Sequence, residues 1–249
     1  MKPLGIKNYG SIAHIPSSRM GPGDHSCPAG QAAIATIKTR DKHDFVVCLE
    51  KLDGSNVGVA KADGAILPLT RSGYLANTSP YEQHHRFSEW VYAHQAQFSE
   101  LLQEGERVVG EWLLQAHGTR YNLPHEPFVA FDFLQGGDRK LYGELIDRAA
   151  DAGIETARVL SFGYHAFSLE SALKAIQVSG HGAIDAVEGV VWRVERKNKV
   201  EFLCKYVRPE KVDGCYLSEI SGQPVVWNRF KGDAASIFSW LYPQTMEVA

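Results

Sequence analysis

Short apolar runs separated by turn dipeptides fill residues 44–73, and this alternation most limits how the chain can fold. The segment DFVVCLEKLDGSNVGVAKADGAILPLTRSG contains a β-branched run at 46–50, the turn signal Asp53-Gly54 and further apolar stretches divided by Ala-Asp-Gly. It predicts a strand, a turn and further strands. The same strand pattern recurs at 107–114, 128–134, 187–195 and 200–207.

The clearest helical signal begins at Ser79. Ser79 suits an N-cap, Pro80 the first helical position, and Glu82 completes a capping box. Apolar residues then recur at helical spacing, and Gly105 follows them. These signals predict one long helix that ends before Gly105.

Other helical patterns are short and lie between the strand patterns. Residues 143–153 and 168–180 each predict a helix that ends in glycine, and 234–242 predict an amphipathic helix. Residues 1–40 are rich in Gly, Pro and Ser and predict short strands and turns. Strands that outnumber helices, with hairpin turns between them, predict an α+β fold with antiparallel sheets flanked by helices.

Length and composition are those of a globular protein. The chain has 249 residues, of which 44% are hydrophobic and 22% charged, so wholesale disorder is excluded. We expect one main domain over residues 1–211 and a short tail, 212–249, too small for a second full domain. No apolar stretch is long enough to span a membrane, and the N-terminus lacks a signal-peptide core, so we expect a cytoplasmic protein. The four cysteines form no CxxC pair and are expected to be reduced thiols.

Lys51 ends the first apolar strand and precedes Asp53-Gly54. Alone, this short pattern also fits a surface lysine before a hairpin. A functional Lys51 would be a nucleophile, which requires a neutral amine, whereas free lysine has a pKa of about 10.4. Burial and neighbouring cations lower that pKa because each disfavours the charged form.

A series of further polar and aromatic positions follows Lys51. Each has an ordinary structural interpretation: Phe131 fits a core, Glu111 a solvated strand position, and Arg71 a loop. Their order and spacing together favour a functional interpretation. The series consists of Arg71-Ser72-Gly73, Gly110-Glu111, Phe131 within FVAFDF, Glu188-Gly189-Val190-Val191, and Lys205.

This ordered set, from Lys51 to Lys205, resembles the covalent nucleotidyltransferase superfamily, which contains ATP-dependent RNA and DNA ligases and mRNA capping enzymes. It is most similar to the RNA ligase branch, typified by the phage enzyme that seals nicks in duplex RNA. The resemblance implies an adenylyltransferase domain related to the ATP-grasp fold.

The resemblance implies catalytic roles for four residues. Lys51 would attack the α-phosphate of ATP to form lysyl-AMP. Glu188 would help to position Mg²⁺ (or Mn²⁺), and Lys205 would stabilise charge at the α-phosphate. Asn56 matches the RNA ligase form of the first motif and would assist the later steps.

Four more residues would bind the nucleotide. Phe131 would stack on adenine, and Glu50, or its backbone, would lie near the adenine edge. Glu111 would accept a hydrogen bond from a ribose hydroxyl, and Arg71 would contact phosphate or ribose.

The implied activity is ATP-dependent joining of RNA 5′-phosphate and 3′-hydroxyl ends, including nicks in duplex RNA, in RNA repair. Sealing of DNA nicks by the same chemistry is an alternative, and a catalytically idle nucleotide- or RNA-binding relative is another. The short tail leaves open a partner protein that heals ends or grips the substrate.

One departure from the family pattern motivates the idle alternative. Related ligases often carry two lysines spaced K-x-K in the last motif, whereas Leu203 and Val207 flank Lys205 at those positions. The second phosphate contact is therefore missing unless Arg208 or Lys199 replaces it.

Three other segments carry polar residues of no assigned role. The loop AHGTRYNLPHE, with His117, fits either a surface loop or a loop over the substrate end. His84 is expected to be solvated at the start of its helix. IPSSRMGPGDH, at 15–25, is unusual enough to suggest contact with nucleic acid.

The net charge of −3 argues against a protein that coats nucleic acid. Residues 193–211, however, contain seven basic and three acidic residues, a local charge of +4 around Lys205. We expect such a patch to hold a phosphate backbone with modest, salt-sensitive affinity. A solvated hairpin is the other interpretation.

Overall fold

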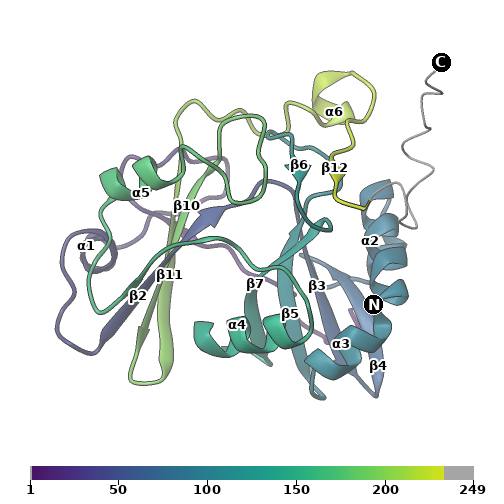
Figure 1. The fold of residues 1–249 in the computed structure, drawn as a ribbon, viewed down its shortest axis with the longest axis horizontal. Helices are drawn as coiled ribbons and strands as arrows, with labels where there is room; N and C mark the ends of the chain where they lie inside the picture. The colour runs from purple at the N-terminus through teal and green to yellow at the C-terminus, as the bar shows by residue number, and fades with distance from the viewer. Residues whose placement is uncertain (1, 233–249) are drawn as a thin grey trace.

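A computed structural model describes residues 2–232 and shows two five-stranded sheets with helices around them. In Figure 1 the two sheets lie side by side, with α1 and α5 beside the first sheet and α2 and α3 beside the second. The antiparallel pairing confirms the predicted α+β class. The predicted helix at 234–242 lies outside the described residues.

The first sheet has the order β1-β11-β10-β2-β9. Its strands pair antiparallel except β1, which runs parallel to β11. Their bounds are β1 Ala13–His14, β2 Asp44–Lys51, β9 Val159–Gly163, β10 Gly189–Arg196 and β11 Lys199–Val207.

The second sheet has the order β4-β3-β5-β7-β8, and a short two-stranded sheet pairs β12 with β6. The bounds are β3 Ser55–Ala62, β4 Ala65–Thr70, β5 Glu106–Trp112, β7 Phe128–Gln135, β8 Asp138–Arg139, β6 Asn122–Leu123 and β12 Arg229–Phe230. β2 ends at Lys51 in the first sheet and β3 begins at Ser55 in the second. The Asp53-Gly54 turn is therefore the point at which the chain crosses between sheets.

The helices are α1 Ala29–Thr36, α2 Glu82–Ala93, α3 Gln95–Leu101, α4 Tyr142–Asp151, α5 Leu169–Ala175 and α6 Ser218–Ser221, with a 3₁₀ turn at Ala76–Thr78. The sequence prediction missed α1, where AGQAAIAT follows Pro28 and Ala32 and Ala35 are buried. Alanine favours helix, but the Gly and Pro residues before it dominated the prediction.

The long helix predicted from Ser79 is in fact two helices. The prediction that Ser79 and Glu82 form a capping box is also wrong. α2 begins at Glu82, and Ser79 lies outside it with its Oγ 2.6 Å from Nδ1 of His84. His94 separates α2 from α3 with φ −105° and ψ 21°, and its Nδ1 lies 2.8 Å from the Trp90 carbonyl oxygen. A side chain that competes for backbone partners accounts for the break.

The largest core cluster packs α2 and α3 against the second sheet. Phe87, Trp90 and Phe98 of these helices pack against Trp112 or Phe128, with ring centroids 5.4–6.1 Å apart. Aromatic pairs at such separations add to the free energy gained from burial. This cluster fixes β5 and β7, which carry two of the predicted site residues, Glu111 and Phe131.

The described part of the tail packs onto the domain. Asn228 N donates to Leu114 O over 2.8 Å, Asn228 Oδ1 accepts from Tyr121 N, and Phe230 is buried in the main core. The division at residue 211 stays a prediction.

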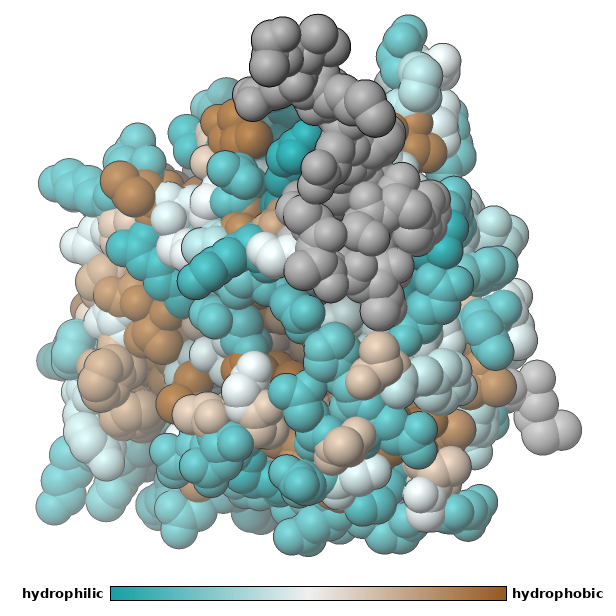
Figure 2. All heavy atoms as spheres, turned by 45° about the vertical axis from the view of Figure 1, so that its right-hand side comes forward, coloured by the Kyte–Doolittle hydropathy of each residue, from teal (hydrophilic) through white to brown (hydrophobic). Residues whose placement is uncertain are grey.

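The outer surface is ordinary for a folded chain. Figure 2 shows a mainly hydrophilic face on which hydrophobic side chains occur in small groups. Scattered apolar residues of this kind need no special explanation. No helix within residues 2–232 is both long and apolar enough to cross a membrane.

Candidate active site

A pocket of about 380 Å³ lies between the two sheets. The first sheet contributes residues of β2, β10 and β11, and the second contributes residues of β3, β5 and β7. All eight predicted site residues except Glu188 line it: Glu50, Lys51, Asn56, Arg71, Glu111, Phe131 and Lys205. Residues that lie up to 155 positions apart in the sequence thus meet in one cavity.

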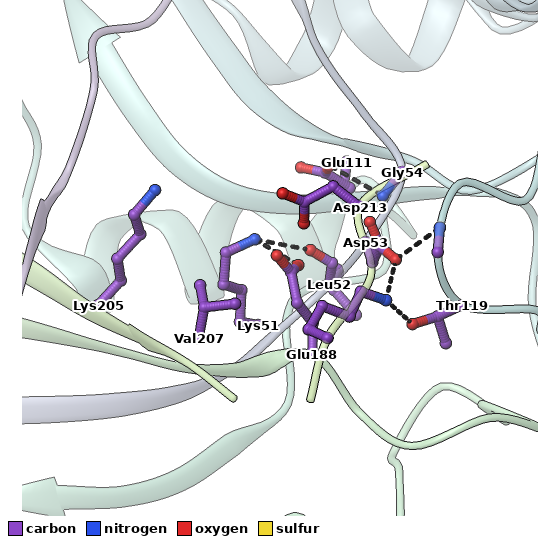
Figure 3. A network of polar contacts seen from close by, with 12 residues as sticks. Lys51, Leu52, Asp53, Gly54, Glu111, Thr119, Glu188, Lys205, Val207 and Asp213 are labelled. Atoms are coloured by element: carbon purple, nitrogen blue, oxygen red, sulfur yellow. Dashed lines mark hydrogen bonds and ion pairs between the residues drawn. The ribbon is translucent and has the colours of Figure 1, made fainter. Parts of the chain in front are cut away.

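Glu188 reaches the site through Lys51. It immediately precedes β10, and the next residue, Gly189, pairs with Lys51 across the ladder. Lys51 Nζ lies 2.5 Å from Glu188 Oε2 and donates to Leu52 O over 3.3 Å. Figure 3 shows both contacts, with Lys205 to one side of Lys51.

The Lys51 amine is held as an ammonium. Burial alone would lower the pKa of Lys51, but Glu188, Glu111 and Asp53 outweigh it, and the pKa is raised above the usual range. The sequence argument, in which burial and nearby cations leave a neutral amine, is therefore wrong for this state. A nucleophilic Lys51 must first lose its contact with Glu188.

Glu111 concentrates negative charge beside the same lysine. It lies on β5 opposite Asn56, and its Oε1 accepts a hydrogen bond from Gly54 N over 3.1 Å. Burial raises the pKa of Glu111 to about 7; Lys51 opposes the shift and Glu188 adds to it. Burial likewise raises the pKa of Glu188, against the Lys51 ammonium.

The carboxylates of this site suit a divalent cation. Mg²⁺ and Mn²⁺ prefer oxygen ligands, and three carboxylates, those of Glu188, Glu111 and Asp53, lie close enough to Lys51 to raise its pKa. The donor set therefore fits the implied metal, with Glu188 as the predicted ligand.

A second group of metal-ligating residue types, two histidines and a glutamate, is a poorer metal site than the carboxylates beside Lys51. His125, Glu155 and His181 have potential ligand atoms within 4.8 Å of one another. His181 Nε2, however, accepts from Arg158 N over 3.1 Å, so neutral His181 carries its proton on Nδ1, which lies 2.8 Å from His125 Nε2. That nitrogen offers no lone pair to an ion.

Phe131 and Arg71 are placed by the N-terminal segment. The ring of Tyr9 packs edge-on against Phe131, with centroids 5.3 Å apart, and Tyr9 OH donates to Asp132 over 2.9 Å. Arg71 Nη2 donates to Ser11 Oγ over 3.2 Å. Gly73 has φ +87°, and a Cβ there would overlap the Ile6 carbonyl oxygen, so glycine lets this segment approach the Arg71 turn.

Glu50 and Asn56 differ in what they offer a ligand. The Glu50 carboxylate is buried and accepts from Ser179 Oγ over 2.5 Å and from Gly180 N over 2.8 Å. Its backbone N–H also has a partner, Arg158 O at 2.9 Å, so neither group is left to donate to or accept from a nucleotide in this structure. Asn56 Oδ1, in contrast, is buried without a hydrogen-bond partner among the described residues. Such an oxygen is costly to leave unpaired, which fits a ligand contact.

Lys211, which the sequence argument counted only as a patch residue, is buried beside the Asp53-Gly54 turn. Its Nζ contacts Asp53 Oδ2 and donates to Thr119 Oγ1 over 2.5 Å. Gly118 N donates to the same Asp53 oxygen over 2.9 Å. Lys211 thus ties the turn after Lys51 to the loop at 118–119, and no local pattern around it signals this.

Two histidines also line the pocket. His84, expected to be solvated, has its Nε2 2.7 Å from Ser55 Oγ, and burial lowers its pKa to about 4. His117 Nε2 lies 3.0 Å from Gln83 Oε1, and burial also lowers its pKa. Both rings are neutral at pH 7. Both ring nitrogens of His84 already contact hydroxyls, those of Ser55 and Ser79, so a hydrogen bond to a ligand falls to His117.

The lysine missing from the last motif is not replaced as the sequence suggested. Leu203 and Lys205 both line the pocket. Lys199 is exposed at the start of β11, and Arg208 lies beyond its end, 3.9 Å from Glu210. Among the described residues, Leu203 therefore occupies this part of the wall without a substitute cation from β11.

The basic stretch at 193–211 is not one continuous patch. Arg193 is buried and pairs with Asp132 and Glu195, at 2.8 and 2.6 Å. Arg196 pairs with Asp41 and Asp44, and Lys211 is buried with Asp53. Three of the seven basic residues are thus already paired with acids, so the expectation of a single phosphate-binding patch is wrong.

Comparison with known proteins identifies a family. The model of the family described as RNA ligase matches residues 44–207, more than half of the chain. No curated protein matches the sequence.

Several solved structures are also similar. An archaeal ATP-dependent RNA ligase is 16% identical, with a TM-score of 0.47 over 80% of this chain and 48% of its own. Naegleria gruberi RNA ligase with PPi is 16% identical, with a TM-score of 0.48 over 74% and 53%. A mutant of that ligase with ATP and Mn is 15% identical, with a TM-score of 0.48 over 67% and 50%. The chain spans about half the length of these structures.

Proposed function

The chain belongs to the RNA ligase family, and from this premise we propose that it is an ATP-dependent RNA ligase. It joins 5′-phosphate and 3′-hydroxyl ends through lysyl-AMP and an adenylylated RNA end. The observation that carries the proposal is the pocket between the sheets, where Lys51 meets Glu188, Glu111 and Lys205. A lysine, a second cation and the Glu111 carboxylate in one cavity, with Glu188 in contact with that lysine, suit phosphoryl transfer.

The pocket walls divide into a nucleoside part and a phosphate part. Phe131, backed by Tyr9, offers a ring face to adenine. Glu111 accepts a hydrogen bond from a ribose hydroxyl when its carboxyl is ionised. Arg71 and Lys205 supply the positive charge that a triphosphate requires.

In the first step Lys51 Nζ forms a bond to the α-phosphorus, and the bond to pyrophosphate breaks. The amine must give up a proton to solvent, so the contact with Glu188 that holds the ammonium has to be released. Lys205 stays charged and neutralises the oxygens of the α-phosphate. A divalent cation bound at the carboxylates supplies further positive charge beside the phosphates.

In the later steps AMP passes to an RNA 5′-phosphate, and a 3′-hydroxyl then displaces it. Asn56 lies on β3 beside Glu111, with its Oδ1 unpaired among the described residues. We assign this amide to the terminal nucleotide of the substrate, because a buried acceptor without a partner favours a ligand that can donate to it.

The idle alternative rests on Leu203, which lines the pocket where many relatives carry a lysine. In that case the protein would bind a nucleotide or RNA without forming lysyl-AMP. The intact set of Lys51, Glu188 and Lys205 favours the enzyme.

The test is a two-stage sealing assay. Purified protein is incubated with α-labelled ATP and Mg²⁺, then chased with 5′-phosphorylated nicks in RNA and DNA duplexes side by side. We expect label on the protein, then on the RNA end, and a sealed RNA product; Asn56→Ala should stop after the first stage. Lys51→Ala should take up no label. Its matched control is Lys199→Ala, which changes an exposed lysine on the hairpin. Folded protein that binds ATP without taking up label supports the idle alternative, and preferential sealing of DNA supports the DNA ligase.

A further inference from the structure

The N-terminal strap, residues 6–27, follows the edge of β11 and lies outside the segment that the family model matches. Its strand β1 pairs His14 with Lys205. Directly after this pair Ile15 N donates to Lys205 O over 2.9 Å, and further along Arg19 N donates to Val207 O over 3.0 Å. The strap is therefore hydrogen-bonded to β11 at Lys205, the residue that the proposed chemistry places at the α-phosphate.

Asp24 brings a carboxylate to that lysine. Its Oδ1 lies 3.6 Å from Lys205 Nζ. Its Oδ2 accepts from Gly21 N over 2.9 Å and lies 3.1 Å from His14 Nε2. One oxygen is thus held by the strap itself, which leaves the other directed at the ammonium.

His14 links this carboxylate to the backbone of β11. It is buried, and its Nδ1 lies 2.6 Å from Ser18 Oγ. Ser18 Oγ accepts in turn from Val207 N over 2.9 Å. Polar contacts run from Lys205 to Asp24, from Asp24 to His14 at 3.1 Å without hydrogen-bond geometry, and from His14 through Ser18 to the strand that carries Lys205. The strap therefore holds the carboxylate beside that strand.

The charges that face Lys205 explain why a dedicated carboxylate matters. Burial and the Lys51 ammonium lower the pKa of Lys205, whereas Asp24 and Glu188 raise it. Burial and Lys205 lower the pKa of His14, so this ring is neutral and adds no positive charge. Glu188 is already in contact with Lys51 at 2.5 Å. Asp24 is therefore the acid that pairs with Lys205, whereas Glu188 pairs with Lys51.

We propose that Asp24 is a positioning residue for Lys205: carried by the N-terminal strap, it holds the ammonium charged and in place beside the α-phosphate site. The inference rests on the proposed function for its effect on rate. The strap positions two further residues in the same way: Tyr9 packs on Phe131, and Ser11 accepts a hydrogen bond from Arg71. With Asp24 it therefore contacts three of the residues assigned to the nucleotide.

The rate test is a double-mutant cycle of single-turnover adenylylation with Asp24→Asn and Lys205→Ala. We expect Asp24→Asn to slow the reaction about tenfold, and to change it less than about twofold when Lys205 is already alanine, because residues in one contact network are coupled. Asp24→Glu should recover part of the rate. The matched control is Asp138→Asn, an exposed aspartate on β8. An additive cycle, or a rate unchanged by Asp24→Asn, overturns the inference.

A second readout does not depend on activity. In ¹⁵N-lysine NMR, the Nζ signal of Lys205, identified by its loss in Lys205→Arg, should shift in Asp24→Asn and stay in place in Asp138→Asn. If the wild type takes up no AMP while the signal shifts as described, the proposed function fails and the Asp24 contact stands. If Asp24→Asn leaves the signal unmoved in folded protein, the contact itself is disproved.

Discussion

Lys51 Nζ lies 2.5 Å from Glu188 Oε2, although 137 residues separate the two. The pairing of β2 with β10 makes this contact, because Lys51 is opposite Gly189 in the ladder. The nucleophile assigned to the proposed reaction is thus stored as an ammonium by the residue predicted to bind the metal. Activation of Lys51 and occupation of the site by a substrate are therefore linked.

The first prediction concerns pH. Because the pKa of Lys51 is raised, almost all of the lysine is protonated at pH 7, and its neutral fraction grows tenfold per pH unit. Single-turnover transfer of AMP should rise with a slope of about one in log rate against pH, between about pH 6 and 9. Glu111→Gln should keep this slope, since it removes only the carboxyl that titrates near 7. A flat profile contradicts the prediction.

The second prediction concerns the stability cost of Glu111. Its folded pKa of about 7 lies above its usual value of 4.5, so the folded state loses stability as pH rises from about 4.5 to 7. Glu111→Gln should therefore unfold less readily than wild type at pH 8, by about 1 to 3 kcal/mol, with the difference vanishing near pH 4. Urea denaturation at both pH values measures this, with the exposed Glu100→Gln as control. Equal stability of Glu111→Gln and wild type at pH 8 would show that burial does not destabilise the ionised Glu111 carboxylate.

The third prediction concerns Lys211. Lys211→Met leaves Asp53, whose side chain is only 13% exposed, without its buried cation, which should lower the free energy of unfolding by about 3 to 5 kcal/mol. The double variant with Asp53→Asn should recover part of this loss, because no unpaired charge remains. Thermal and urea denaturation measure both, with the exposed Lys42→Met as control. A loss below about 1 kcal/mol, the range of surface pairs, would refute the buried pair.

The fourth prediction restores the second lysine. Leu203 lines the pocket beside Lys205, so Leu203→Lys should place another cation near the phosphates. We expect the KM for ATP in adenylylation to fall about three- to tenfold, which corresponds to roughly 1 kcal/mol of charge interaction near a surface. Leu203→Met keeps the volume without the charge and serves as control. A higher KM for the lysine variant would mean that Leu203 is needed for packing.

Most of the strands, and seven of the residues that line the pocket, could be predicted from the sequence. Lys51, Glu111 and Phe131 each end or occupy a strand pattern, and alternation on paired strands directs Glu111 and Phe131 to the same face of the second sheet. The order of motifs then identified a family whose model covers the same residues. Periodicity and the order of motifs can be read along the sequence, so neither requires knowledge of the fold.

What the sequence could not predict depends on contacts between distant segments. Ser79 has the residue type of an N-cap, but its hydroxyl contacts His84 and the helix begins three residues later. Lys211 and Asp24 look like surface charges until the fold places them against Asp53 and Lys205. The state of Lys51 also required the structure, because Glu188 reverses the effect of burial on its pKa.

The most direct test of the account is to locate AMP on the protein. After incubation with ATP and Mg²⁺, peptide mapping by mass spectrometry at neutral to alkaline pH, where a phosphoramidate survives, should find one AMP on the peptide that contains Lys51. Lys51→Ala should carry none, and acid treatment should remove the group from the wild type. AMP on another residue, or folded wild type that binds ATP and stays unmodified, would contradict the central claim that Lys51 is the nucleophile.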